Sequence, residues 1–134
     1  MAPRFMWLFV VLYGSLGIAA IVLPDIERRI VAFFTRTTPV RFLGVFLIIL
    51  GVWVFRIARD TGWPMLAQTL GVVHSIAGGV NLILPDAMVV FNEAWIERRP
   101  VWHRFMGLLY VAVAYLCYLA TVVSEAGGPP TDAV

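Results

Sequence analysis

The sequence predicts an all-α membrane protein with four transmembrane helices, which form two parallel-repeat helical hairpins, each with an amphipathic interfacial helix on the cytoplasmic side. Composition is the first indication: 61% of the 134 residues are hydrophobic and only 13% are charged, too little polar surface to cover a water-soluble core. Four apolar segments supply the spans. A recurring pattern then divides the chain into two similar halves.

The repeat is clearest at the end of the first apolar segment of each half. Leu23–Asp25 aligns with Leu84–Asp86, an offset of 84 − 23 = 61 residues, and Arg41–Gly44 aligns with Arg104–Gly107 after a two-residue insertion. Because each half contains two spans, an even number, both halves cross the membrane in the same direction. The resulting division is one membrane domain (1–134), repeat one (about 5–58), repeat two (about 65–124) and a Gly- and Pro-rich tail predicted to be disordered (about 126–134).

The four spans follow from the apolar runs in order along the chain. They are Phe5–Leu23, Phe42–Phe55, Met65–Leu84 and Phe105–Ser124. The first, third and fourth contain about 20 residues, the length that the hydrocarbon layer requires at the helical rise. The second is shorter, and the arginines at its ends are expected to extend toward the headgroups. The first span is expected to be retained rather than cleaved as a signal peptide, because it is the counterpart of the third.

The connection inside each half is predicted to be a helix that lies on the membrane surface. Its apolar stripe in the first half is Ile26, Ile30, Phe33 and Phe34, and in the second half Met88, Phe91 and Trp95. Glu27 and Arg28 lie largely away from the first stripe. Asp25 is expected to cap the first of these helices, and Pro39 and Pro100 are expected to end the two segments.

All ten basic residues are arginines, and their distribution predicts the orientation. Seven lie in the two connections inside the halves, namely Arg28, Arg29, Arg36, Arg41, Arg98, Arg99 and Arg104. The positive-inside rule places these connections in the cytoplasm and both termini outside it. The arginines expected to contact lipid headgroups are Arg28, Arg29, Arg98, Arg99 and Arg104. A nucleic-acid partner is not expected, because the net charge is only +2 and the arginines flank membrane spans.

Small residues form a ridge along the third span, and such a ridge lets another helix approach closely. Its members recur every four residues: Ala67, Gly71, Ser75 and Gly79. We expect this ridge to pack against the first span, which carries Gly14 and Gly17. A helix from a second copy or from another membrane protein is the alternative partner.

Polar side chains in the same span need partners in a dry environment. They are Gln68, His74 and Asn81, and the candidate hydrogen-bond partners from other spans are Tyr13, Tyr110 and Tyr115. The alternative is a site near mid-membrane for a proton, a small molecule or a metal cofactor, formed by His74, Asn81, Gln68 and Tyr13.

A haem held by two histidines does not fit a single chain. His74 lies near the middle of its span and His103 at the cytoplasmic end of another, a depth difference of about 15 Å at the helical rise. Two copies of His74 across a dimer are the remaining arrangement. The sequence therefore predicts no metal site and no cofactor for the chain alone.

Catalysis is not expected either. Cys117 is the only cysteine, and none of the eight carboxylates lies within a predicted span. His74 and Ser75 are adjacent on one helix and point in different directions, so they do not form a nucleophile and its base.

Each half begins with an apolar span that contains glycines and ends at a proline. An amphipathic stretch follows, and then a proline and an Arg-Phe-x-Gly motif lead into the second span. The residues are Gly14, Gly17, Pro24, Pro39, Arg41, Phe42 and Gly44, and in the second half Gly78, Pro85, Pro100, Arg104, Phe105 and Gly107. In these features the chain resembles the small YjeT-like bacterial inner-membrane proteins, as a tandem duplication. The resemblance covers most of both halves and implies a multi-pass protein of the cell inner membrane, without an activity or ligand site.

The function predicted from these observations is that of a non-catalytic accessory or scaffolding subunit. Its expected partners are membrane lipids and either other membrane-protein subunits or further copies of itself. The alternative is a protein that binds or carries a lipid or small molecule at a polar site around His74 and Asn81.

Overall fold

The computed structural model describes residues 2–61 and 63–126, with side chains described for residues 6–59, 61 and 63–123. Its elements are all helical, which confirms the predicted class: α1 (Ala2–Val22), α2 (Pro24–Phe33), α3 (Thr37–Ile57), the short 3-10 helix η1 (Ala58–Asp60), α4 (Pro64–Ile83), α5 (Pro85–Ile96) and α6 (Pro100–Ala126). Of the tail predicted to be disordered, Ala126 ends α6 and the rest lies outside the described residues.

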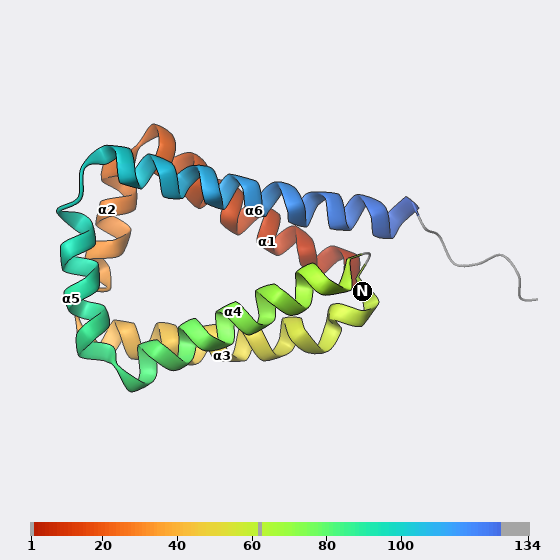
Figure 1. Ribbon diagram of the computed structural model, residues 1–134, viewed down its shortest axis with the longest axis horizontal. Helices are drawn as coiled ribbons and strands as arrows, with labels where there is room; N and C mark the ends of the chain where they lie inside the picture. Colours follow the sequence, from red (N-terminus) through yellow and green to blue (C-terminus); the bar gives the residue numbers. More distant parts are fainter. Residues whose placement is uncertain (1, 62, 127–134) are drawn as a thin grey trace, which may run out of the picture.

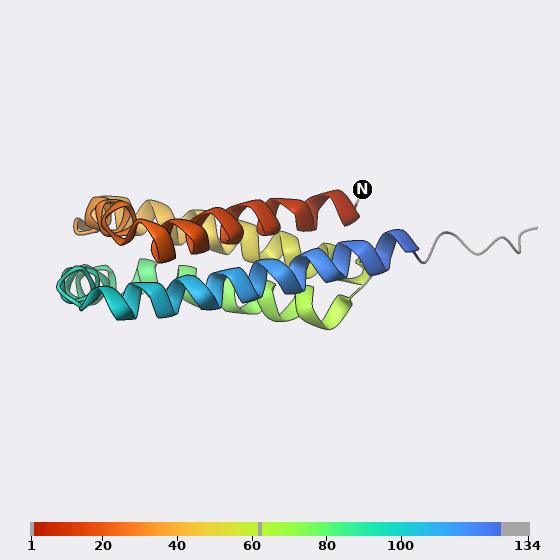
Figure 2. The ribbon, with the colours of Figure 1, turned by 90° about the horizontal axis from the view of Figure 1, so that it is seen from above.

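The long helices form two close pairs, α1 with α6 and α3 with α4 (Figure 1). The pairs converge at the end where the chain begins and spread apart toward α2 and α5, which run across the wide end. Figure 2 shows that α1, α2 and α3 make one layer and α4, α5 and α6 a second layer. Both connecting helices therefore lie at the same end of the molecule, opposite the N-terminus and the end of α6.

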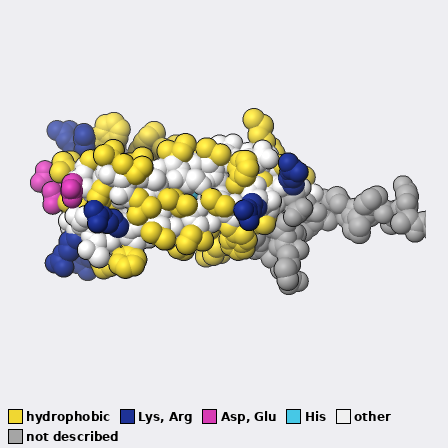
Figure 3. Space-filling view, turned by 90° about the horizontal axis from the view of Figure 1, so that it is seen from below, with side chains coloured by type: hydrophobic (Ala, Val, Ile, Leu, Met, Phe, Trp, Pro, Cys, Tyr) yellow, Lys and Arg dark blue, Asp and Glu magenta, His cyan; other side chains and the backbone are white. Residues whose placement is uncertain are grey.

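Several helices are long and apolar enough to span a membrane. Three of them qualify individually: α3, α4 and residues Pro100–Val123 of α6. Residues Met6–Val22 of α1 qualify together with α2, from which they are separated by a bend of 119°, so the total is three or up to four. On the face shown in Figure 3, apolar side chains cover the middle, arginines lie toward both ends and acidic side chains gather at the wide end. These features indicate an integral membrane protein.

The boundaries correct three local predictions. Pro39 and Pro100 do not end the surface helices; they lie in the first turns of α3 and α6, where the missing N–H has no helical partner to lose. The second span is consequently 21 residues long rather than short. Asp25 does not cap α2, which begins at Pro24 without a side-chain cap; its carboxylate lies 3.6 Å from the Arg28 guanidinium instead.

Glycines set the separation within each helix pair. A Cβ added to Gly78 of α4 would lie 2.6 Å from the carbonyl oxygen of Gly44 in α3, and one added to Gly71 would lie 2.7 Å from that of Gly51. In the other pair, a Cβ on Gly17 of α1 would lie 2.8 Å from the carbonyl oxygen of Gly107 in α6. The paired backbones are thus in direct contact, which only glycine permits.

The predicted partner of the small-residue ridge was therefore wrong. Ala67, Gly71 and Ser75 belong to the α4 helix that packs on α3, whereas Gly14 and Gly17 of α1 face α6. A Cβ added to Gly79, the last residue of the ridge, would meet no atom within 4 Å. The reason is geometric: residues four apart rotate by about 40° per step around a helix, whereas residues seven apart return to within about 20° of the same face. The glycines that make the contact are accordingly spaced by seven.

A buried hydrophobic core lies at the narrow end, where the two pairs meet. Its buried residues include Met6 and Phe9 of α1, Val54 of α3, Leu70 of α4 and Cys117 of α6. Toward α2 and α5 the pairs diverge, and the cavities of the candidate site lie in the space between them.

Candidate ligand-binding site

Two adjoining cavities occupy the space between the diverging helix pairs. The first has a volume of about 400 Å³, and its polar lining residues are Tyr13, His74 and Tyr110. Its remaining wall is apolar: Leu12, Leu16, Leu43, Phe46, Leu47, Leu50, Val73 and Ala77. The second, about 280 Å³, shares Leu16, Leu43 and Tyr110 with the first and adds Glu27, Asn81 and Asn92. Mostly apolar walls with a few polar groups, at this volume, are typical of small-molecule sites.

His74 is held by hydrogen bonds from both ring nitrogens. Nδ1 lies 2.6 Å from the carbonyl oxygen of Leu70, and Nε2 lies 2.7 Å from the hydroxyl oxygen of Tyr13. A carbonyl oxygen only accepts, so Nδ1 carries the proton and Nε2 accepts from the Tyr13 hydroxyl. Of the three tyrosines considered from the sequence, Tyr13 is the one that bonds His74. In this tautomer the His74 ring fixes the direction of the Tyr13 hydroxyl.

Tyr110 of α6 lines both cavities. Its ring lies 5.8 Å from that of Tyr13, measured between centroids. Within residues 6–59, 61 and 63–123, its hydroxyl makes no hydrogen bond to another side chain or to the backbone. A phenol can both donate and accept, so Tyr110 offers a hydrogen-bonding group to a molecule in either cavity.

The other polar candidates on α4 differ in position. Asn81 is buried and lines the second cavity, where its Nδ2 donates to the carbonyl oxygen of Ala77 at 2.8 Å. The backbone thus satisfies one of its donors and leaves the amide oxygen available to a ligand. Gln68 lines neither of these two cavities. The predicted set of His74, Asn81, Gln68 and Tyr13 is therefore brought together in part.

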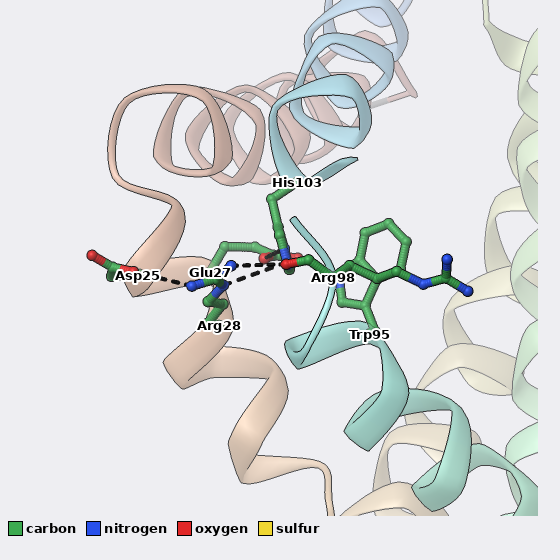
Figure 4. A network of polar contacts seen from close by, with 6 residues as sticks. All are labelled: Asp25, Glu27, Arg28, Trp95, Arg98 and His103. Atoms are coloured by element: carbon green, nitrogen blue, oxygen red, sulfur yellow. Dashed lines mark hydrogen bonds and ion pairs between the residues drawn. The ribbon is translucent and has the colours of Figure 1, made fainter. Parts of the chain in front are cut away.

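A polar network with Glu27 and His103 buried at its centre joins the helices at the wide end of the molecule (Figure 4). The Glu27 carboxylate accepts hydrogen bonds from Trp95 Nε1 at 3.0 Å and from His103 Nδ1. Arg28 donates from Nη2 to the carbonyl oxygen of Arg98 at 2.8 Å, and its Nε lies 3.5 Å from His103 Nε2. Because these residues belong to α2, α6 and the end of α5 with its following turn, the network ties the wide end together.

Sequence reasoning missed this network. Glu27 is predicted to lie away from the apolar stripe of its helix, but its exposed fraction is 8%, and its partner His103 is fully buried. A signal was present: Ile30 and Val31 follow Glu27 by three and four residues, so the carboxylate shares a helix face with apolar side chains. A lone carboxylate on such a face needs a partner from another element.

The arginines expected at lipid headgroups divide into two groups. Arg28 is partly buried and is used within the protein, through its contacts with Arg98 and His103. The others are exposed: Arg29, Arg98, Arg99 and Arg104. Their side chains remain available to phosphate groups of the membrane.

No group of three or more His, Cys, Asp or Glu side chains that could hold a metal ion occurs in the described part of the chain. The chain matches no family model, and the comparisons with curated proteins and with solved structures likewise find no match. The chemistry of the cavities is therefore the basis for the function proposed next.

Proposed function

We propose that this protein binds a lipid or another hydrophobic small molecule within the membrane, in the two adjoining cavities. The observation that carries the proposal is the hydroxyl of Tyr110, a half-buried residue that lines both cavities without a hydrogen bond to the described protein. Among the described residues no buried side-chain polar atom lacks a partner, so the Tyr110 hydroxyl is accessible from the cavities, where a polar group of a ligand can bond it.

The lining indicates the class of ligand. The apolar walls around Leu43, Phe46 and Leu47 suit an aliphatic or aromatic body. Tyr110 supplies a donor for a ligand oxygen, and the Tyr13 oxygen, whose proton is directed at His74, retains lone pairs for a ligand donor. A molecule with one polar group and an extended apolar part fits this arrangement.

A groove on the outer surface supports entry from the lipid. It has a volume of about 570 Å³ and is lined by Phe33, Phe34, Thr38, Pro39, Phe42, Leu43 and Phe46. It shares Leu43 with both cavities, Phe34 with the second and Phe46 with the first. An apolar ligand dissolved in the bilayer could thus reach the cavities without crossing water.

Tyr110→Phe tests the proposal by removing a single hydroxyl. We expect native mass spectrometry of protein extracted in mild detergent to show a bound small molecule, and Tyr110→Phe to retain about tenfold less of it, because one hydrogen bond in an apolar site is lost. Tyr115→Phe is the matched control, since Tyr115 is exposed and lines neither cavity.

Two outcomes contradict this proposal. One is a protein that carries no small molecule but emerges in fixed ratio with other membrane subunits, which supports the accessory or scaffolding role predicted from the sequence. The other is equal retention of the small molecule by the parent, Tyr110→Phe and Tyr115→Phe, which places the ligand elsewhere.

The proposed architecture is the parallel repeat. Its support comes from contacts between equivalent positions: Tyr13 and His74, 61 residues apart, bond each other. Gly17 contacts Gly107, just as Gly78 contacts Gly44. A twofold relation between the halves accounts for both, because it pairs the first span of each half with the second span of the other.

The proposed location is the cell inner membrane, as the YjeT-like resemblance implies, with α2, α5 and their arginines in the cytoplasm. Labelling of intact cells with a membrane-impermeant maleimide tests the orientation. We expect Arg59→Cys to react and Arg29→Cys to react only after permeabilisation, since both positions are exposed and lie at opposite ends. The parent protein provides the background, because its Cys117 is fully buried. The reverse labelling pattern contradicts this orientation.

A further inference from the structure

A separate hollow lies on the outer side of the wide end, at the junction of α5 and α6. Its volume is about 270 Å³, and its lining is Phe91, Ala94, Trp95, Arg98 and Trp102. None of these residues lines the two central cavities. Three aromatic rings and one arginine thus surround a hollow that is independent of the candidate site.

The walls of this hollow are held in place on their inner side by contacts with Glu27, Arg28 and His103. The Trp95 indole donates to Glu27, and its ring contacts the buried His103 ring with centroids 5.1 Å apart. Phe91 stacks on Trp95 with centroids 6.3 Å apart. The backbone carbonyl of Arg98 accepts the hydrogen bond from Arg28. A site whose walls are already held in place loses little conformational entropy when a ligand binds.

The charge in the hollow is positive and available. Figure 4 shows the Arg98 guanidinium directed away from the network of Glu27 and His103. Among the ion pairs of the described residues, none involves Arg98, and no carboxylate lines the hollow. Guanidinium groups bind phosphate oxygens through two parallel hydrogen bonds, which favours an anionic phosphate as the ligand.

We propose that this hollow binds the headgroup phosphate of an anionic glycerophospholipid. Arg98 contacts the phosphate, and the glycerol and first methylene groups rest on Trp102 and Phe91, which are 49% and 58% exposed. Tryptophan and arginine at the ends of spanning helices are characteristic of the headgroup level, and basic pockets there bind anionic lipids. A headgroup that carries a positive charge without a phosphate is disfavoured, because the Arg98 guanidinium would repel it.

The test compares phosphatidylglycerol with phosphatidylcholine of the same acyl chains, each titrated into the full-length protein in detergent and followed by native mass spectrometry. We expect the parent protein to bind phosphatidylglycerol about tenfold more tightly, and Arg98→Gln to lose this preference. Arg36→Gln is the matched control, because Arg36 is an exposed arginine just before α3, is not among the arginines expected at lipid headgroups, and does not line the hollow. Arg98→Gln leaves the backbone carbonyl that Arg28 uses, and circular dichroism checks its helix content.

Two more measurements distinguish this hollow from the central cavities and from a site for free phosphate. Tyr110→Phe is expected to keep the full preference for phosphatidylglycerol, so failure of the central-cavity proposal leaves this one standing. Glycerol phosphate without acyl chains is expected to compete poorly. The proposal is overturned if the parent shows no lipid preference, if Arg98→Gln and Arg36→Gln lose it equally, or if glycerol phosphate competes as well as the lipid.

Discussion

Glu27→Ala is expected to lower the free energy of unfolding by about 3 kcal/mol, through loss of the acceptor that two buried donors share. The Glu27 carboxylate accepts from the Trp95 indole and from the fully buried His103 imidazole. Alanine leaves both N–H groups without their partner and opens space beside them. Reversible denaturation in mixed micelles, followed by tryptophan fluorescence, measures the change.

Glu93→Ala is the control for this substitution. Glu93 lies on α5 and is exposed, so its loss is expected to change the free energy of unfolding by less than about 0.5 kcal/mol. Similar losses in the two variants would mean that the network does not hold the wide end together. Glu27→Gln should fall between them, because its amide oxygen can still accept one of the two hydrogen bonds.

Gly78→Ala is expected to destabilise the protein by about 1 to 3 kcal/mol, the usual range for overpacking a close contact. The added methyl group would lie 2.6 Å from the carbonyl oxygen of Gly44 and 2.8 Å from the backbone nitrogen of Ile48. Both are backbone atoms of α3, so the contact can be relieved only by moving one helix away from the other. The same denaturation experiment measures the effect.

The adjacent glycine provides an unusually close control. A Cβ on Gly79 meets nothing within 4 Å, so Gly79→Ala is expected to be neutral or to stabilise the helix by up to about 1 kcal/mol through better helix propensity. If Gly79→Ala destabilised the protein as much as Gly78→Ala, the helix pairing described for α3 and α4 would be incorrect.

These two glycines also mark the limit of what the sequence predicted. Hydropathy was sufficient for the helical class and for separate short helices at α2 and α5, because these depend on neighbouring residues. The choice of α3 rather than α1 as the partner of α4 was missed, because any helix with glycines on one face satisfies the local pattern. Only the contact geometry distinguishes Gly78, which touches α3, from Gly79, which does not.

The candidate site divides in the same way. The polar line that includes His74 was visible in the sequence because a histidine within an apolar run needs a partner. The role of Tyr110 depends on which hydroxyl lacks a hydrogen bond, and that follows only from the positions of all its neighbours. The Glu27 network joins residues about 70 positions apart, as in the Trp95 and Arg98 contacts, so no local periodicity identifies it.

The divergence of the two helix pairs has a consequence for the bilayer itself. With α2 and α5 in one leaflet, as proposed above, a molecule of this outline displaces more lipid from that leaflet than from the opposite one (Figure 1). Any change in the spread of the pairs then alters the area taken up in one leaflet alone. Lateral pressure in that leaflet therefore acts directly on the width of the cavities. A ligand that pushes the two helix pairs apart has to work against this pressure.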